Sequence, residues 1–244
     1  MKQIGDKINE YMRNVHRFAD IFNYYLYDGK PSVNADQLHE LSPDKTTPPL
    51  VQNVLGETAH NAFSHFIAMR DDHMVYLLLN VWDQSGSNYA IAVKDLLFAA
   101  SQYTCQLEEM DADGKLLPVI NVVLYWSPEK WDSAESIHEL LKTDNRQLLQ
   151  FIPNYRINLL APFDMDDGDF GKFQTSLAEC LQFVKYSNDT ADLRCIIEKN
   201  PKFQHLNKSA AELINAIMWE NLMSDYDIRE IDMRMVLNYL FKSN

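Results

Sequence analysis

Residues 63–84 read Phe-Ser-His-Phe-Ile-Ala-Met-Arg-Asp-Asp-His-Met-Val-Tyr-Leu-Leu-Leu-Asn-Val-Trp-Asp-Gln. Two β-rich runs, 63–69 and 74–82, flank the polar turn 70–73, and this pattern predicts an antiparallel β-hairpin. The second strand ends at Trp82, which Asp83 and Gln84 follow. A hairpin brings residues that are distant in sequence to one end of a sheet, so its open end can form a shared site.

The segments around this hairpin predict an α/β protein. Amphipathic spacing predicts long helices over 8–27 and 89–109. The nearly continuous apolar run 117–126 predicts a buried central strand. The remaining predictions are a loop over 42–49, a short strand over 155–160, a short helix over 133–141 capped by Ser133, and helices over 169–186, 209–223 and 228–241. The order predicts an α/β core followed by a helical C-terminal third.

Composition sets limits on where the protein acts. The chain has 244 residues and is 46% hydrophobic, enough to bury a substantial core. Its longest apolar runs fall far short of the roughly 20 residues of a membrane-spanning helix. The first residues lack the apolar segment of a signal peptide, so we expect a cytoplasmic protein that does not bind membranes. Cys105, Cys180 and Cys195 have no CxxC spacing and are expected to be buried, reduced thiols.

Several motifs occur in the order found in one nuclease family. They are Phe18-Ala19-Asp20-Ile21-Phe22-Asn23, the hairpin to Gln84, Ser101-Gln102-Tyr103, Val119-Ile120-Asn121-Val122-Val123-Leu124-Tyr125-Trp126 and Asn154-Tyr155-Arg156-Ile157-Asn158-Leu159. In this order the chain resembles the PD-(D/E)xK nuclease-fold transposases, also called recombination-promoting nucleases. The resemblance implies a restriction-endonuclease-like mixed sheet flanked by helices over residues 1–190, with a helical extension over 191–244.

The resemblance also implies where metal ligands would lie. Family members pair an acid on the first hairpin strand with an acid at the end of the second, and two carboxylates suit Mg²⁺, which prefers oxygen ligands. The matching positions here are Ser64 and Trp82, with Gln84 as the third motif residue. An indole cannot ligate a metal. Asp83 points to the opposite strand face unless a bulge intervenes, which leaves Asp20 on the first helix as a further candidate acid.

Three hypotheses follow for the function. The favoured one is a transposase-like protein whose catalytic centre is degenerate and which acts by binding, without a cofactor. The second is an active Mg²⁺-dependent DNA endonuclease with a rearranged site built from Asp20, Asp83 and Gln84. The third is an acidic inhibitor or adaptor. The net charge of −13 motivates this third hypothesis, in which the partner is a basic, nucleic-acid-binding protein, although solubility alone also explains the acidity. The charge opposes general attraction to DNA but leaves room for a local basic groove, so DNA stays a candidate partner.

Other metal-binding patterns are weak. His60, His65 and His73 have neither helical i, i+4 spacing nor accompanying cysteines, which disfavours zinc. The acidic run 164–169 lacks the glutamate that ends a calcium-binding loop, because residue 175 is a threonine. We therefore predict that this run caps the helix that follows it.

Overall fold

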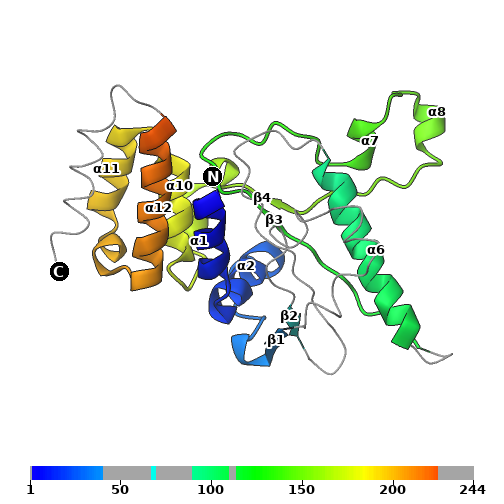
Figure 1. Cartoon of the computed structure of the whole chain (residues 1–244), viewed down its shortest axis with the longest axis horizontal. Helices are drawn as coiled ribbons and strands as arrows, with labels where there is room; N and C mark the ends of the chain where they lie inside the picture. The colour runs from blue at the N-terminus through cyan, green and yellow to red at the C-terminus, as the bar shows by residue number, and fades with distance from the viewer. Residues whose placement is uncertain (1, 41–66, 70–89, 110–113, 225–244) are drawn as a thin grey trace. The chain divides into compact units, whose positions relative to one another are not determined.

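The computed structural model describes residues 2–40, 67–69, 90–109 and 114–224 (Figure 1). The protein is mixed α/β, with mostly helices in this part of the chain. It divides into two compact units. The first unit comprises residues 1–35, 126–130 and 161–244, and the second comprises residues 36–125 and 131–160.

The first unit is helical in its described residues. Its α-helices are α1 (Lys2–Met12), α2 (Val15–Tyr27), α9 (Asp167–Phe170), α10 (Leu177–Tyr186), α11 (Thr190–Lys199) and α12 (Lys208–Ser224). The short 3-10 helices η2 (Pro162–Asp164) and η3 (Pro201–His205) connect them. α1 packs against α12, and α12 packs against α10 (Figure 1). Fully buried side chains such as Phe18, Phe22 and Phe183 form the core.

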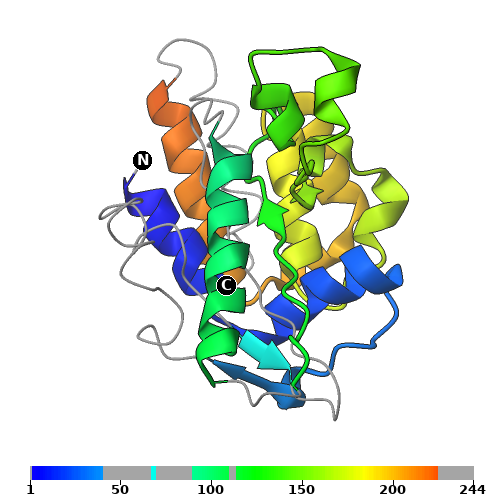
Figure 2. The ribbon, with the colours of Figure 1, turned by 90° about the vertical axis from the view of Figure 1, so that its right-hand side faces the viewer.

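The second unit combines one long helix with two small sheets. Its elements are β1 (Leu38–Glu40), β2 (Ile67–Met69), α6 (Ile91–Glu109), β3 (Val123–Leu124), α7 (Ile137–Leu140), α8 (Arg146–Leu149) and β4 (Leu159–Leu160), while η1 (Ala35–Gln37) crosses the boundary between the units. β3 pairs with β4 in parallel, with Val123 opposite Leu159. α6 runs beside the extended chain that leads to β3, and Val119 N–H donates to the Tyr103 hydroxyl at 3.2 Å (Figure 2).

Two predicted helices are interrupted, which corrects the sequence-based prediction. The helix expected over 8–27 is two helices, because the Asn14 side chain accepts hydrogen bonds from the backbone N–H groups of His16 and Arg17 and so starts α2. The helix expected over 169–186 is likewise divided into α9 and α10. In the short helix α7, the N-cap is Ser136 and not Ser133.

Other predictions are confirmed in whole or in part. Helix α6 occupies most of 89–109, and α12 matches the helix expected over 209–223. Of the apolar run 117–126, which was expected to be one strand, only Val123–Leu124 forms a strand, β3. Residues 122–126 are buried, whereas Leu117 is exposed. The helix α11 was not predicted.

The predicted hairpin is described only at its first strand. Ile67–Met69 forms β2, as expected for part of a strand, and pairs antiparallel with β1, a partner that the sequence did not predict. The turn 70–73, the second strand 74–82, the loop 42–49 and the helix 228–241 lie outside the described residues. Among the helices of the described residues, none is long and apolar enough to cross a membrane.

Candidate functional site

Of the candidate site residues that the family resemblance suggests, only Asp20 lies in the part of the chain that the structure describes. Ser64, Trp82, Asp83 and Gln84 lie outside them, so the expectations for these four positions stay predictions. Asp20 lies on α2, and its side chain is buried, with 2% of the residue exposed. The structure therefore tests the surroundings of one acid of the expected site.

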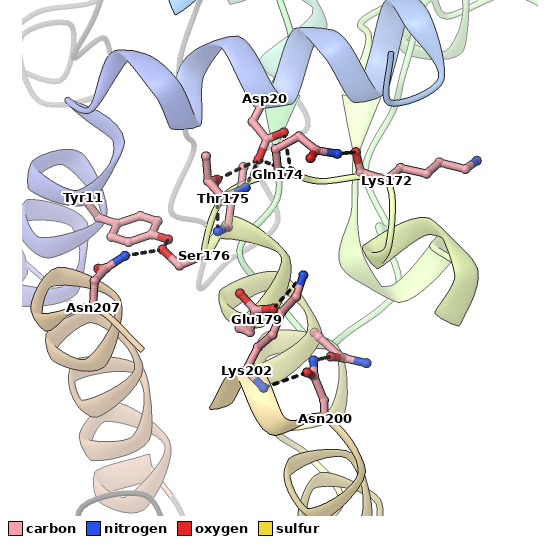
Figure 3. Close-up of polar contacts among 12 residues, drawn as sticks. Tyr11, Asp20, Lys172, Gln174, Thr175, Ser176, Glu179, Asn200, Lys202 and Asn207 are labelled. Carbon is pink, nitrogen blue, oxygen red and sulfur yellow. Dashed lines mark hydrogen bonds and ion pairs between the residues drawn. The ribbon is translucent and has the colours of Figure 1, made fainter. Parts of the chain in front are cut away.

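The carboxylate of Asp20 holds the loop between α9 and α10. Its Oδ1 accepts a hydrogen bond from Gln174 N–H at 2.9 Å, and its Oδ2 accepts from Thr175 N–H at 2.8 Å and from the Thr175 hydroxyl at 2.7 Å (Figure 3). A loop that turns into a helix has backbone N–H groups without partners inside the helix. Asp20 supplies the missing acceptors from a different helix.

This arrangement does not fit a magnesium site. A carboxylate that accepts hydrogen bonds from three donors and is shielded from water has to give up several charge-assisted bonds before it can ligate a metal. Within the described residues, no group of three or more His, Cys, Asp or Glu side chains is arranged to hold a metal ion. Asp20 has the surroundings of a structural residue that fixes the start of α10.

A polar pocket of about 370 Å³ lies beside the Asp20-bound loop. It is bounded by the first turn of α10, by η3 and by the start of α12. Its lining residues are Gln174, Thr175, Ser176, Glu179, Pro201, Lys202, His205, Leu206 and Asn207. Figure 3 shows many of their polar groups within one small region of the first unit.

Glu179 is the buried charged group of this pocket. Only 4% of the residue is exposed, and burial raises the pKa of its carboxyl group. Its Oε1 lies 3.9 Å from Nζ of Lys202, and the positive charge of that lysine partly offsets the increase in the pKa. The Lys202 side chain is 65% exposed, so water partly screens this long ion pair.

Neutral hydrogen bonds fix the opposite wall of the pocket. Asn207 Nδ2 donates to Ser176 Oγ at 2.9 Å, and Ser176 Oγ also pairs with the Tyr11 hydroxyl at 2.9 Å. Asn207 Oδ1 accepts from Ala210 N–H at 3.0 Å, which caps α12. The starts of α10 and α12 are thereby held side by side at the pocket.

The second unit contains a separate buried polar cluster. Asp95 on α6 is 2% exposed and accepts a hydrogen bond from the Tyr155 hydroxyl at 2.7 Å. Burial raises the pKa of Asp95 to about 6, although Tyr155 and Asn121 both favour the charged carboxylate. Asn121 thus lies close to Asp95, yet among the described residues its Nδ2 and Oδ1 have no well-formed hydrogen bond. This cluster is incompletely satisfied.

The acidic run 164–169 caps a helix, but this helix is the four-residue α9 and not the long helix predicted over 169–186. Asp166 precedes α9, and its backbone N–H donates to Asp169 Oδ2 at 2.8 Å. Nζ of Lys172 bridges Asp169 at 2.9 Å and Asp28 at 2.7 Å. Of the three cysteines, all free, Cys180 is buried as expected, whereas Cys105 and Cys195 are half-buried.

Sequence reasoning missed Glu179, Lys202 and Asp95. One signal was available: Ser176-Leu177-Ala178-Glu179 has the S-x-x-E spacing of a capping box, which marks a helix start and places Glu179 in the first turn. Asp95 had no comparable signal, because a lone acid in an amphipathic helix most often faces water.

Comparisons with protein-family models, with curated proteins and with solved structures gave no match.

Proposed function

We propose that this protein is a transposase-like chain of the PD-(D/E)xK nuclease fold that has lost its catalytic metal ligands and acts by binding. The finer fold assignment, a restriction-endonuclease-like core, is part of this proposal. It draws on the motif order of the sequence and on Ser64 and Trp82 at the positions where the family carries acids.

The observation that carries the proposal is the engagement of Asp20. If the first helix supplied a carboxylate to a metal, that carboxylate would need free lone pairs and access to water-borne ions. Asp20 instead accepts hydrogen bonds from Gln174 and Thr175 inside the first unit. These hydrogen bonds support a protein that has kept the fold and in which Asp20 has a structural role.

The alternative of an active endonuclease needs Asp83 and Gln84 to form the site with Asp20. Catalytic groups that act as a unit lose nearly all activity when one member is removed. Because the Asp20 carboxylate already accepts hydrogen bonds from Gln174 and Thr175, Asp83 would have to hold the metal without it. We therefore favour binding over phosphodiester hydrolysis.

A reversion experiment tests the proposal. We expect the natural chain to leave duplex and single-stranded DNA intact with Mg²⁺ or Mn²⁺. The double variant Ser64→Asp with Trp82→Glu should gain Mg²⁺ binding and weak, metal-dependent cleavage, because it restores both acids. The matched control is Ser64→Asn with Trp82→Gln, which has similar shapes and no added charge. Cleavage by the natural chain contradicts the loss of catalysis, and no metal binding by the double variant contradicts the nuclease fold.

A second candidate function, an acidic adaptor, is favoured by one exposed segment. Asp164, Asp166 and Asp167 are exposed around α9, beside Phe163, which is 45% exposed. Acidic side chains around an exposed aromatic ring suit a basic protein partner. Binding to a basic nucleic-acid enzyme should weaken steeply with salt and weaken further in Asp166→Asn/Asp167→Asn. Equal binding by this variant would contradict the adaptor function.

A further inference from the structure

The pocket between α10, η3 and α12 carries charges of both signs, and this combination selects its ligand. The charges of the pocket are those of Glu179 and Lys202, which have no part in the proposed function. The pocket volume of about 370 Å³ lies within the range of roughly 300–1,000 Å³ that is usual for small-molecule sites.

One wall is negative. The Glu179 side chain is 5% exposed and still lines the pocket. Its Oε1 lies 3.9 Å from Nζ of Lys202, which is longer than a hydrogen bond, and the Asn200 side chain also favours the charged carboxylate. The two oxygens of a carboxylate can accept further hydrogen bonds beside these contacts. A buried carboxylate of this kind gains from a cationic donor that approaches within hydrogen-bond distance.

The opposite side of the pocket is positive. Lys202 projects from η3 and is exposed. The pocket also meets the start of α12 after Asn207, and a helix start carries partial positive charge. The start of α10 adds little, because the Asp20 carboxylate already accepts hydrogen bonds from the loop before it. An anionic group in this part of the pocket is therefore favoured by a lysine and by one helix dipole.

We propose that this pocket binds a small zwitterion of the α-amino acid class. The ammonium group of the ligand pairs with Glu179, and its carboxylate lies toward Lys202 and the start of α12. A simple anion meets the repulsion of Glu179, and a simple cation meets that of Lys202 and of the start of α12. A ligand with both charges on adjacent groups satisfies both walls at once.

Calorimetric titration of the full chain with three matched probes tests this site. The probes are L-alanine, propionate, which lacks the amino group, and ethylamine, which lacks the carboxylate. We expect L-alanine to bind with a Kd of about 1 mM or lower, which corresponds to about 4 kcal/mol. Propionate and ethylamine should each bind at least about tenfold more weakly, because each loses one charged contact.

Charge-neutral variants locate the binding. Glu179→Gln and Lys202→Met should each weaken L-alanine binding by about tenfold or more. Glu212→Gln, on an exposed part of α12, and Lys199→Met, at the end of α11, are the matched controls and should bind as the natural chain does. Circular dichroism melts check that each variant is folded, and Lys202→Met, on an exposed residue, keeps the test valid if Glu179→Gln unfolds.

Three results would overturn the proposal. The first is no heat of L-alanine binding up to about 20 mM, a range well above the expected Kd. The second is propionate or ethylamine binding as tightly as L-alanine. The third is unchanged L-alanine affinity in folded Glu179→Gln or Lys202→Met.

Discussion

Asp20 in the first unit and Asp95 in the second are equally buried, yet their partners differ. Both residues are 2% exposed. Asp20 accepts hydrogen bonds from two backbone N–H groups and a hydroxyl, whereas Asp95 accepts one from Tyr155 and lies near an amide without well-formed bonds. Burial of a carboxylate is costly unless donors replace water. The contrast shows that the hydrogen-bond donors around a buried acid, and not burial alone, decide whether the acid stabilises the fold.

Removing Asp20 should have the largest effect. Asp20→Ala leaves three donors of the loop before α10 without their acceptor, and each buried unsatisfied donor costs about 1–3 kcal/mol. We expect a loss of about 4 kcal/mol in the free energy of unfolding, measured by urea denaturation. Asp144→Ala, at an exposed position, is the control and should change stability by less than about 0.5 kcal/mol. A loss below about 1 kcal/mol for Asp20→Ala would show that the loop does not depend on this carboxylate.

Neutralising Asp95 should have the opposite sign. Its pKa is about 6 in the folded protein against 3.8 for an unperturbed carboxyl group. The folded state therefore binds the proton more tightly, and stability decreases as the pH rises from about 4 to about 6. Asp95→Asn removes this penalty and should stabilise the protein at pH 7 by up to about 3 kcal/mol.

Denaturation at several pH values measures this effect. The difference between Asp95→Asn and the natural chain should vanish below about pH 3, where the carboxyl group is protonated in both states. Greater stability of the natural chain at pH 7 would mean that the hydrogen bond from Tyr155 outweighs burial.

A smaller effect is expected at the break between α1 and α2. Asn14→Ala removes the acceptor for the N–H groups of His16 and Arg17, and loss of such a cap costs about 1 kcal/mol. Asn14→Asp keeps the acceptor and is the matched control. Thermal melts compare the two variants, and equal melting temperatures would show that the cap does not matter.

The smallest effect is expected at an exposed ion pair. Arg194 Nε and Glu198 Oε1 are 2.9 Å apart on α11, with side chains 66% and 46% exposed. Because water screens such pairs, Glu198→Gln should cost at most about 0.5 kcal/mol in urea denaturation, with less effect at high salt. A cost near that of Asp20→Ala would remove the distinction between buried and exposed acids.

The sequence predicted elements whose signal is local and missed those that depend on distant partners. α6 was predicted because its apolar residues recur at helical spacing over nineteen residues. The break at Asn14 was missed because the apolar spacing continues through it, while the side-chain cap decides the structure. The pairing of β1 with β2 depends on residues far apart in sequence, and so does the burial of Asp20 against the loop at Thr175.

The candidate site was predictable to a lesser degree. Asp20 lies on a helix, as predicted, but tertiary packing determines which donors its carboxylate contacts. The pocket at Glu179 combines α10, η3 and α12, and the capping pattern at Ser176 locates the start of only one of these elements.

Asp20 on α2 fixes the loop before α10, and we propose that the chain holds no catalytic metal. Calorimetric titration of the natural chain with Mn²⁺, repeated with Asp20→Asn and Asp83→Asn, tests it most directly. We predict no saturable binding up to about 10 mM Mn²⁺ in any of the three, a concentration at which a two-carboxylate site binds. One saturable Mn²⁺ site in the natural chain that is lost in both variants would contradict the account.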